Sequence, residues 1–134
     1  MVQQNTESFL DKKWAEKFFN KNNYQIFNET LQVKLINIER SHTFDPKSYN
    51  VLYSLEIDGQ KKSVRLSYSQ KHDVEKAYNT MAFFYSHGFN EGKFQVPKPY
   101  AFLKDNRIMI YENISGQTFM NELNQSIDEL VSKV

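Results

Sequence analysis

The histidines and serines are the residues whose types could support metal binding or nucleophilic catalysis, but their spacing supports neither. His42, His72 and His87 are dispersed, and none belongs to a His-Glu-x-x-His or similar zinc-binding pattern. No Gly-x-Ser-x-Gly segment presents a serine for acyl transfer. The chain contains no cysteine, which excludes thiolate ligands and thiol nucleophiles. We therefore expect loop or surface histidines, with neither a metal site nor a hydrolase triad.

Three charged side chains stand out because each lies in or beside an apolar segment. Arg65 lies between two apolar residues, where it can bind a phosphate or face solvent opposite a carboxylate. Glu75 can turn inward to pair with Arg65 or face solvent on its helix. Glu112 ends an apolar run, and it either presents the backbone groups of residues 112–114 to a purine or simply ends an edge strand. Both interpretations stay open for each residue.

The charges of the chain balance, with 17 basic and 16 acidic residues and a formal charge of +1. Binding to a phosphate backbone requires a basic patch, so we expect no nucleic-acid partner. No apolar run approaches the ~20 residues of a membrane helix, and the first residues lack the features of a signal peptide. We therefore expect neither membrane insertion nor secretion. The absence of cysteine fits a reducing compartment, and we expect the cytoplasm.

The length and composition predict a folded unit. The chain has 134 residues, of which 40% are hydrophobic and 15% aromatic. This is enough to bury a core without disulfides or metal. No internal repeat, low-complexity segment or linker divides the chain, so we expect a single domain over residues 1–134.

The first forty residues predict a helix followed by a strand. Apolar residues at four-residue spacing predict a helix over about 8–20, capped by Thr6 or Ser8. Its expected core-facing stripe comprises Leu10, Trp14 and Phe18. Residues 31–39 alternate apolar and polar side chains with a change of phase, which predicts a strand with a bulge.

A hairpin between residues 49 and 68 is the clearest local pattern. Apolar side chains alternate on both sides of Asp58-Gly59, a dipeptide that tolerates the positive φ of a two-residue turn. We therefore expect the second and third strands to pair antiparallel through this turn.

Residues 71–87 predict a second helix, because apolar residues recur at spacings of three and four and Gly88 follows. The side chains expected to face the sheet are Tyr78, Met81 and either Phe84 or Tyr85. Two more strands, 100–103 and 107–112, flank a turn at Asp105-Asn106.

A last amphipathic segment predicts a C-terminal helix over residues 117–134. The elements together predict an α+β fold with a five-stranded, mainly antiparallel sheet. One helix packs on this sheet, and an N-terminal and a C-terminal helix complete the fold.

Three short motifs follow one another between residues 77 and 119: a helix ending at His87-Gly88, the segment Val96-Pro97-Lys98-Pro99, and Glu112-x-x-x-Gly116-x-x-Phe119. In this order they resemble the aminoglycoside phosphotransferase and choline kinase family, which is protein-kinase-like. The resemblance covers about residues 31–125. It implies a kinase-like amino-terminal lobe over 31–116, with 1–30 as a helical extension and 117–134 as the start of the inter-lobe helix.

The resemblance implies that the nucleotide-binding residues are Arg65, Glu75, Glu112, Asn113 and Ile114. Arg65 falls where the family has the lysine that grips the phosphates of ATP, and arginine keeps the charge. The helix glutamate that pairs with this lysine would fall at Ala77, with Glu75 two residues away. The backbone of residues 112–114 would bind the adenine ring.

Family catalysis also needs a carboxyl-terminal lobe with a His-x-Asp-x-x-x-x-Asn loop and a later Asp for magnesium, and the sequence contains neither. We therefore expect a nucleotide-binding lobe that binds ATP weakly, binds magnesium only together with the missing lobe, and is inactive alone. Its expected partners are the nucleotide, the missing lobe or another protein, and a further copy of the chain. The alternative is a stand-alone α+β protein-interaction module without catalytic activity, docking through its sheet or through 117–134.

Overall fold

The computed structural model describes residues 6–28, 32–40, 47–70, 73–91 and 95–114. These residues form an α+β fold around a five-stranded antiparallel sheet with the spatial order β1-β2-β3-β5-β4, which confirms the predicted fold class. The strands are β1 (Val33–Arg40), β2 (Ser48–Ile57), β3 (Gln60–Ser69), β4 (Pro99–Leu103) and β5 (Ile108–Glu112). The helices are the 3₁₀ turn η1 (Thr6–Leu10), α1 (Lys12–Lys21), α2 (Asn23–Phe27) and α3 (Val74–Ser86).

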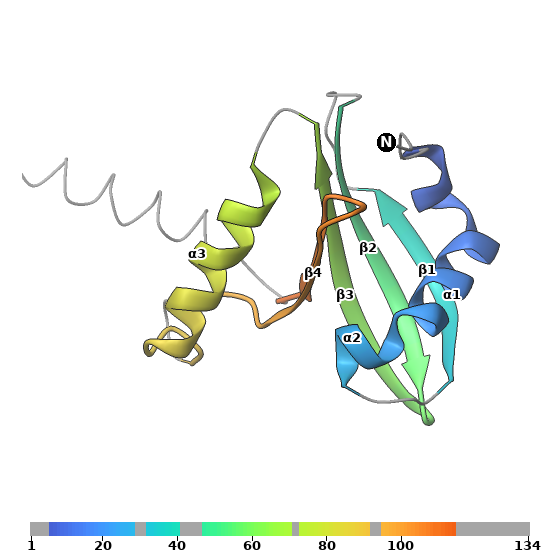
Figure 1. Ribbon diagram of the computed structural model, residues 1–134. Helices are drawn as coiled ribbons and strands as arrows, with labels where there is room; N and C mark the ends of the chain where they lie inside the picture. The colour runs from blue at the N-terminus through green and yellow to red at the C-terminus, as the bar shows by residue number, and fades with distance from the viewer. Residues whose placement is uncertain (1–5, 29–31, 41–46, 71–72, 92–94, 115–134) are drawn as a thin grey trace, which may run out of the picture.

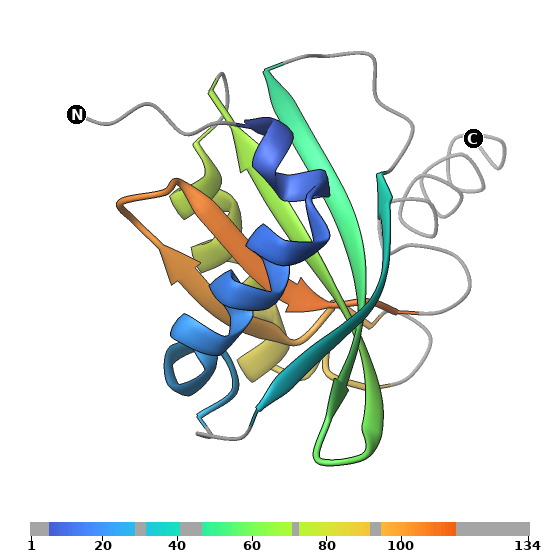
Figure 2. The ribbon, with the colours of Figure 1, turned by 90° about the vertical axis from the view of Figure 1, so that its right-hand side faces the viewer.

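The sheet lies between two helical layers. Figure 1 shows α1 and α2 on one side of the sheet and α3 on the other. In Figure 2, α1 crosses the strands in front of the sheet while α3 lies behind it. The two faces of each strand therefore meet different environments.

The hydrophobic core fills the space between the sheet and the η1–α1–α2 layer. Because side chains alternate along a strand, every second residue of β2, β3 and β5 faces this layer. The buried strand residues of the core include Val51, Tyr53, Leu55, Val64, Leu66, Ile108 and Ile110. The helical layer contributes Phe9, Ala15, Phe18, Phe19 and Ile26.

The two hairpins form where the sequence predicts them. Asp58 and Gly59 both have positive φ, 51° and 77°, as a two-residue turn between twisted strands requires. The turn between β4 and β5 ends at Arg107, which also has a positive φ. The predicted bulge of β1 is confirmed, because its register against β2 shifts between Leu35 and Asn37.

The N-terminal helix differs from its prediction in its cap and its buried face. Asp11 caps α1, because its carboxylate accepts a hydrogen bond from the Lys13 N–H at 2.9 Å. The 3₁₀ turn before Asp11 rotates the preceding residues, so Leu10 is 43% exposed and Phe9 is buried. The predicted cap at Thr6 or Ser8 and the place of Leu10 in the stripe are therefore wrong.

Helix α3 begins at a cap and packs on the sheet through part of its apolar surface. The Asp73 carboxylate accepts from the Lys76 N–H at 3.0 Å, and Tyr78 packs on Phe102 with ring centroids 6.0 Å apart. Met81 and Tyr85 are half-buried.

At the end of α3, Phe84 contacts the rings of Phe83 and Phe89. Gly88 follows the helix with a φ of 104°, as expected of a helix stop.

The predicted C-terminal helix, together with Gly116 and Phe119, lies outside the described residues. Within the described ranges no helix is long and apolar enough to cross a membrane.

Candidate functional site

Arg65 lies on the sheet face that looks toward α3. Its neighbours Val64 and Leu66 are fully buried in the core on the opposite face, so alternation directs the arginine away from the core. Arg65 pairs with Leu52 of β2 and with Tyr111 of β5, which places it in the middle of the sheet. The arginine is half-buried rather than solvated at an edge.

Two asparagines hold the guanidinium of Arg65. Its Nε donates to Asn113 Oδ1 at 2.9 Å, and its Nη1 donates to Asn50 Oδ1 at 2.8 Å. Asn50 comes from β2, and Asn113 follows β5 directly. The guanidinium is therefore held by β2 on one side of β3 and by the residue directly after β5 on the other.

Asn50 is the centre of this polar cluster. Its Nδ2 donates to the Tyr111 hydroxyl at 2.8 Å and to Ser67 Oγ at 3.1 Å, and the two hydroxyl oxygens are 2.9 Å apart. A guanidinium only donates hydrogen bonds, so the Asn50 oxygen must face Arg65 and the amide nitrogen must face the hydroxyls. We call these five residues, Asn50, Arg65, Ser67, Tyr111 and Asn113, the Arg65 network.

The structure does not bring Glu75 to Arg65. Glu75 is exposed in the first turn of α3 and lines a surface depression of that helix together with Asn79 and Phe83. Ala77, at the position where the resemblance places a pairing glutamate, is also exposed. The two asparagines that accept from Arg65 lie in β2 and directly after β5, and neither belongs to α3.

The three predicted residues at the end of β5 and directly after it are placed differently. Glu112 pairs with Val64, so its side chain alternates to the core face, away from Arg65. Its N–H donates to the Lys98 carbonyl at 2.9 Å, and the Asn113 N–H donates to the Ser63 carbonyl at 3.2 Å. Ile114 follows and is half-buried. Both N–H groups already donate to backbone carbonyls, so a purine could accept from them only if these hydrogen bonds were broken.

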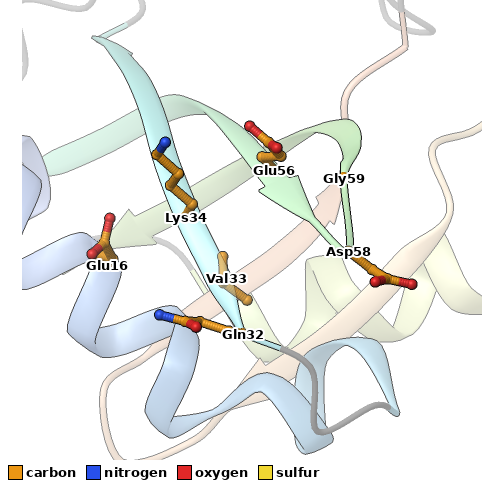
Figure 3. Close-up of a pocket in the computed structure, with 7 residues that line it drawn as sticks. All are labelled: Glu16, Gln32, Val33, Lys34, Glu56, Asp58 and Gly59. Carbon is orange, nitrogen blue, oxygen red and sulfur yellow. The ribbon is translucent and has the colours of Figure 1, made fainter.

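A shallow pocket of about 530 Å³ lies at the β1 edge of the sheet, near the β2–β3 turn. Figure 3 shows its charged lining side chains, Glu16, Lys34, Glu56 and Asp58. The Glu16 carboxylate accepts a hydrogen bond from the Leu35 N–H at 3.0 Å, so this group serves the contact between α1 and β1. In the described part of the chain, no three carboxylates or histidines converge as metal ligands.

Asn50, Ser67 and Tyr111 are the residues of the Arg65 network that the sequence did not predict, whereas Asn113 was predicted for its backbone and not for its side chain. One signal for Asn50 exists. The turn at Asp58-Gly59 fixes the register of the hairpin, and that register pairs Asn50 with Ser67 and Leu52 with Arg65. Asn50 is therefore diagonal to Arg65 on the same sheet face. The contact with Tyr111 could not be read in this way, because β5 is not joined to β3 by a short turn.

A comparison of the chain with protein-family models, with curated proteins and with solved structures finds no match.

Proposed function

We propose that this chain is the nucleotide-binding, amino-terminal lobe of a small-molecule kinase of the aminoglycoside phosphotransferase type. In this proposal Arg65 binds the phosphates of ATP and the end of β5 contacts the base. Phosphoryl transfer would require a second lobe that supplies the magnesium ligands and the acceptor-binding carboxylate.

The position of Arg65 carries the proposal. A positive side chain lies half-buried on the third strand, on the sheet face that also bears the helix following that strand. A kinase lysine that grips phosphates occupies the same strand, next to the same helix. Two oriented hydrogen bonds present the guanidinium on this face, and Arg65 is suited to phosphate because its planar fork matches phosphate oxygens.

Fewer backbone N–H groups would be available to the base than the sequence suggests. Because the N–H groups of Glu112 and Asn113 donate to Lys98 and Ser63, the donor for a purine edge would be the N–H of Ile114. Glu112 would contribute only backbone, since its side chain alternates to the core face. A nucleotide enclosed on one side only remains in contact with water, and we expect a Kd of about 1 mM or weaker.

The test is a titration of ¹⁵N-labelled protein with ATP, with and without magnesium, followed by amide shifts. We expect shifts around Arg65, Ser63 and Ile114, and we expect Arg65→Met to remove them. Urea unfolding of the variant serves as the folding control. Shifts confined to α1 and α2, or shifts that survive Arg65→Met, would contradict the proposal.

A second candidate function is a protein-interaction module, and the exposed aromatic residues in and just after α3 favour it. Phe83 of α3 is 56% exposed, and Phe89, in the turn that follows α3, is 37% exposed. Large exposed aromatic side chains are typical of protein contact surfaces. This candidate replaces the first if ATP causes no amide shifts and if Phe83→Ser removes self-association of the chain, measured by light scattering.

A further inference from the structure

The orientation of Arg65 is built into the sheet. Asn113 accepts from Nε and Asn50 accepts from Nη1, which are two different nitrogens of the planar guanidinium group. A planar group held at two separate positions keeps both its direction and its rotation about the side-chain axis. A single carboxylate partner would leave more freedom, because the flexible stem of arginine has several rotatable bonds.

The neighbours of Arg65 also fix the Asn50 amide. If the amide flipped, its nitrogen would face a group that only donates, and the hydroxyls of Ser67 and Tyr111 would lose their donor. Tyr111 is buried in β5, so this support stands on a rigid strand rather than on a loop. The chain of contacts from β5 through Asn50 to Arg65 stays within the sheet.

We infer that Asn50 and Asn113 are positioning residues for Arg65, which they orient for a polyphosphate independently of Glu75 and of the position of α3. This inference rests on the proposed function, because it assumes that Arg65 binds the phosphates. It differs from an arrangement in which a helix carboxylate positions the cation, where movement of the helix would switch phosphate binding. Here, the two hydrogen bonds from the guanidinium to Asn50 and Asn113 involve no residue of α3.

The first measurement concerns Arg65 itself and uses no nucleotide. The Nε–H resonance of Arg65 should be resolved and slow to exchange with water in the parent protein. Asn113→Leu removes the acceptor and should abolish this signal, whereas Asn113→Asp retains an acceptor oxygen and should restore it. Glu75→Gln should leave the signal unchanged. If Asn113 had a purely structural role, its substitution would lower stability, but the Nε–H signal of Arg65 would not differ between the Leu and Asp variants.

The second measurement is the affinity for inorganic tripolyphosphate and for ATP, from amide shifts. We expect Asn50→Leu and Asn113→Leu each to weaken binding about fivefold, since a misdirected donor loses part of its charge-assisted hydrogen bond. Glu75→Gln should bind as the parent does. If a leucine variant fails to fold, Asn50→Ser or Asn113→Ser replaces it, because serine removes the long acceptor with a smaller change in polarity.

The outcomes separate the inference from the proposed function. If Arg65→Met leaves both affinities unchanged, the proposed function fails, whatever the Nε–H signal shows. If Arg65→Met abolishes binding while the asparagine variants bind as the parent does, the inference is overturned and the function stands. The inference is also overturned if Glu75→Gln weakens binding as strongly as Asn113→Leu.

Discussion

The hydroxyl of Tyr53 makes a buried hydrogen bond that ties the sheet to the N-terminal turn. It donates to the Phe9 carbonyl at 2.5 Å, and both residues are fully buried. Tyr53→Phe keeps the ring but leaves the carbonyl without a donor, so we expect the free energy of unfolding to fall by ~1–3 kcal/mol in urea titrations. Tyr24→Phe, at a residue that is 65% exposed, is the control and should change little. Equal midpoints for all three proteins would mean that this bond contributes nothing.

The pKa of Tyr100 gives a pH dependence with a definite sign. Burial, the nearby Glu112 carboxylate and Tyr85 raise the pKa of Tyr100 from 10.0 to about 12. The unfolded chain therefore loses this proton at a lower pH than the folded protein, so stability is present below about pH 10 and is lost as pH rises toward 12. Burial also raises the pKa of Tyr53, so both residues contribute to the loss in the parent protein.

Tyr100→Phe should make the decline of the urea midpoint between pH 10 and 12 shallower, because the variant has no ionisable group at this position. The comparison at pH 7 controls for lost packing of the ring. A variant whose midpoint declines as steeply as that of the parent would show that Tyr100 does not contribute.

The candidate site shows how far single residues can be predicted from the sequence. Arg65 is recognisable because it is a charged residue between the alternating apolar residues Val64 and Leu66, and the hairpin register places Asn50 near it. The direction of the Glu75 side chain cannot be predicted from the sequence, because helical spacing alone leaves the rotation of α3 relative to the sheet undetermined. Packing contacts such as that of Tyr78 on Phe102 fix that rotation, and Glu75 is exposed in the result.

Helix α1 covers the outer edge of β1 with two polar side chains. Asn20 bonds both backbone groups of Val33, accepting from its N–H at 2.7 Å and donating to its carbonyl at 2.8 Å. Glu16 accepts from the Leu35 N–H at 3.0 Å. An edge strand with open backbone groups invites pairing with other chains, and these contacts occupy part of that edge.

Asn20→Leu should therefore lower stability by ~1–3 kcal/mol, because two backbone groups of β1 lose their partners. We also expect more self-association, measured by light scattering, since the β1 edge becomes available. Lys17→Leu, on the exposed side of α1, is the matched control for added apolar surface. If both variants associate equally, the apolar side chain and not the open edge is the cause.

The strands were easier to predict than the N-terminal helices. Alternation and the Asp58-Gly59 turn determine β2 and β3 locally, within a few residues of each position. The cap at Asp11 was missed because the four-residue spacing of Leu10, Trp14 and Phe18 continues through the 3₁₀ turn that precedes it. The hydrogen bonds of Asn20 with Val33 join residues from separate elements, and no local sequence pattern predicts them.

At the scale of the molecule, one face of the sheet is apolar and the other carries the Arg65 network. The apolar face has no cover other than η1, α1 and α2 among the described residues. The sequence suggests that residues 1–30 are an extension of a lobe that begins at 31. In the structure this segment supplies one wall of the hydrophobic core.

Removal of residues 1–28 should therefore unfold the chain. The segment contributes four large buried side chains, Phe9, Phe18, Phe19 and Ile26. At roughly 1.5–3 kcal/mol for each buried side chain, their loss costs about 6–12 kcal/mol, which is comparable to the roughly 5–15 kcal/mol that stabilises a typical domain. We expect the shortened chain to bind a hydrophobic dye, to give poorly dispersed amide signals and to lose cooperative unfolding.

Two point variants test whether the buried side chains of this segment stabilise the fold. Phe19→Ala, in the middle of the covered face, should cost ~3–5 kcal/mol and leave a folded but weakened protein. Leu10→Ala, at a largely exposed residue of the same segment, should cost little. A chain of residues 29–134 that unfolds cooperatively near the parent midpoint would show that these residues fold alone. The N-terminal helices would then be an accessory layer, and the apolar face would need another cover.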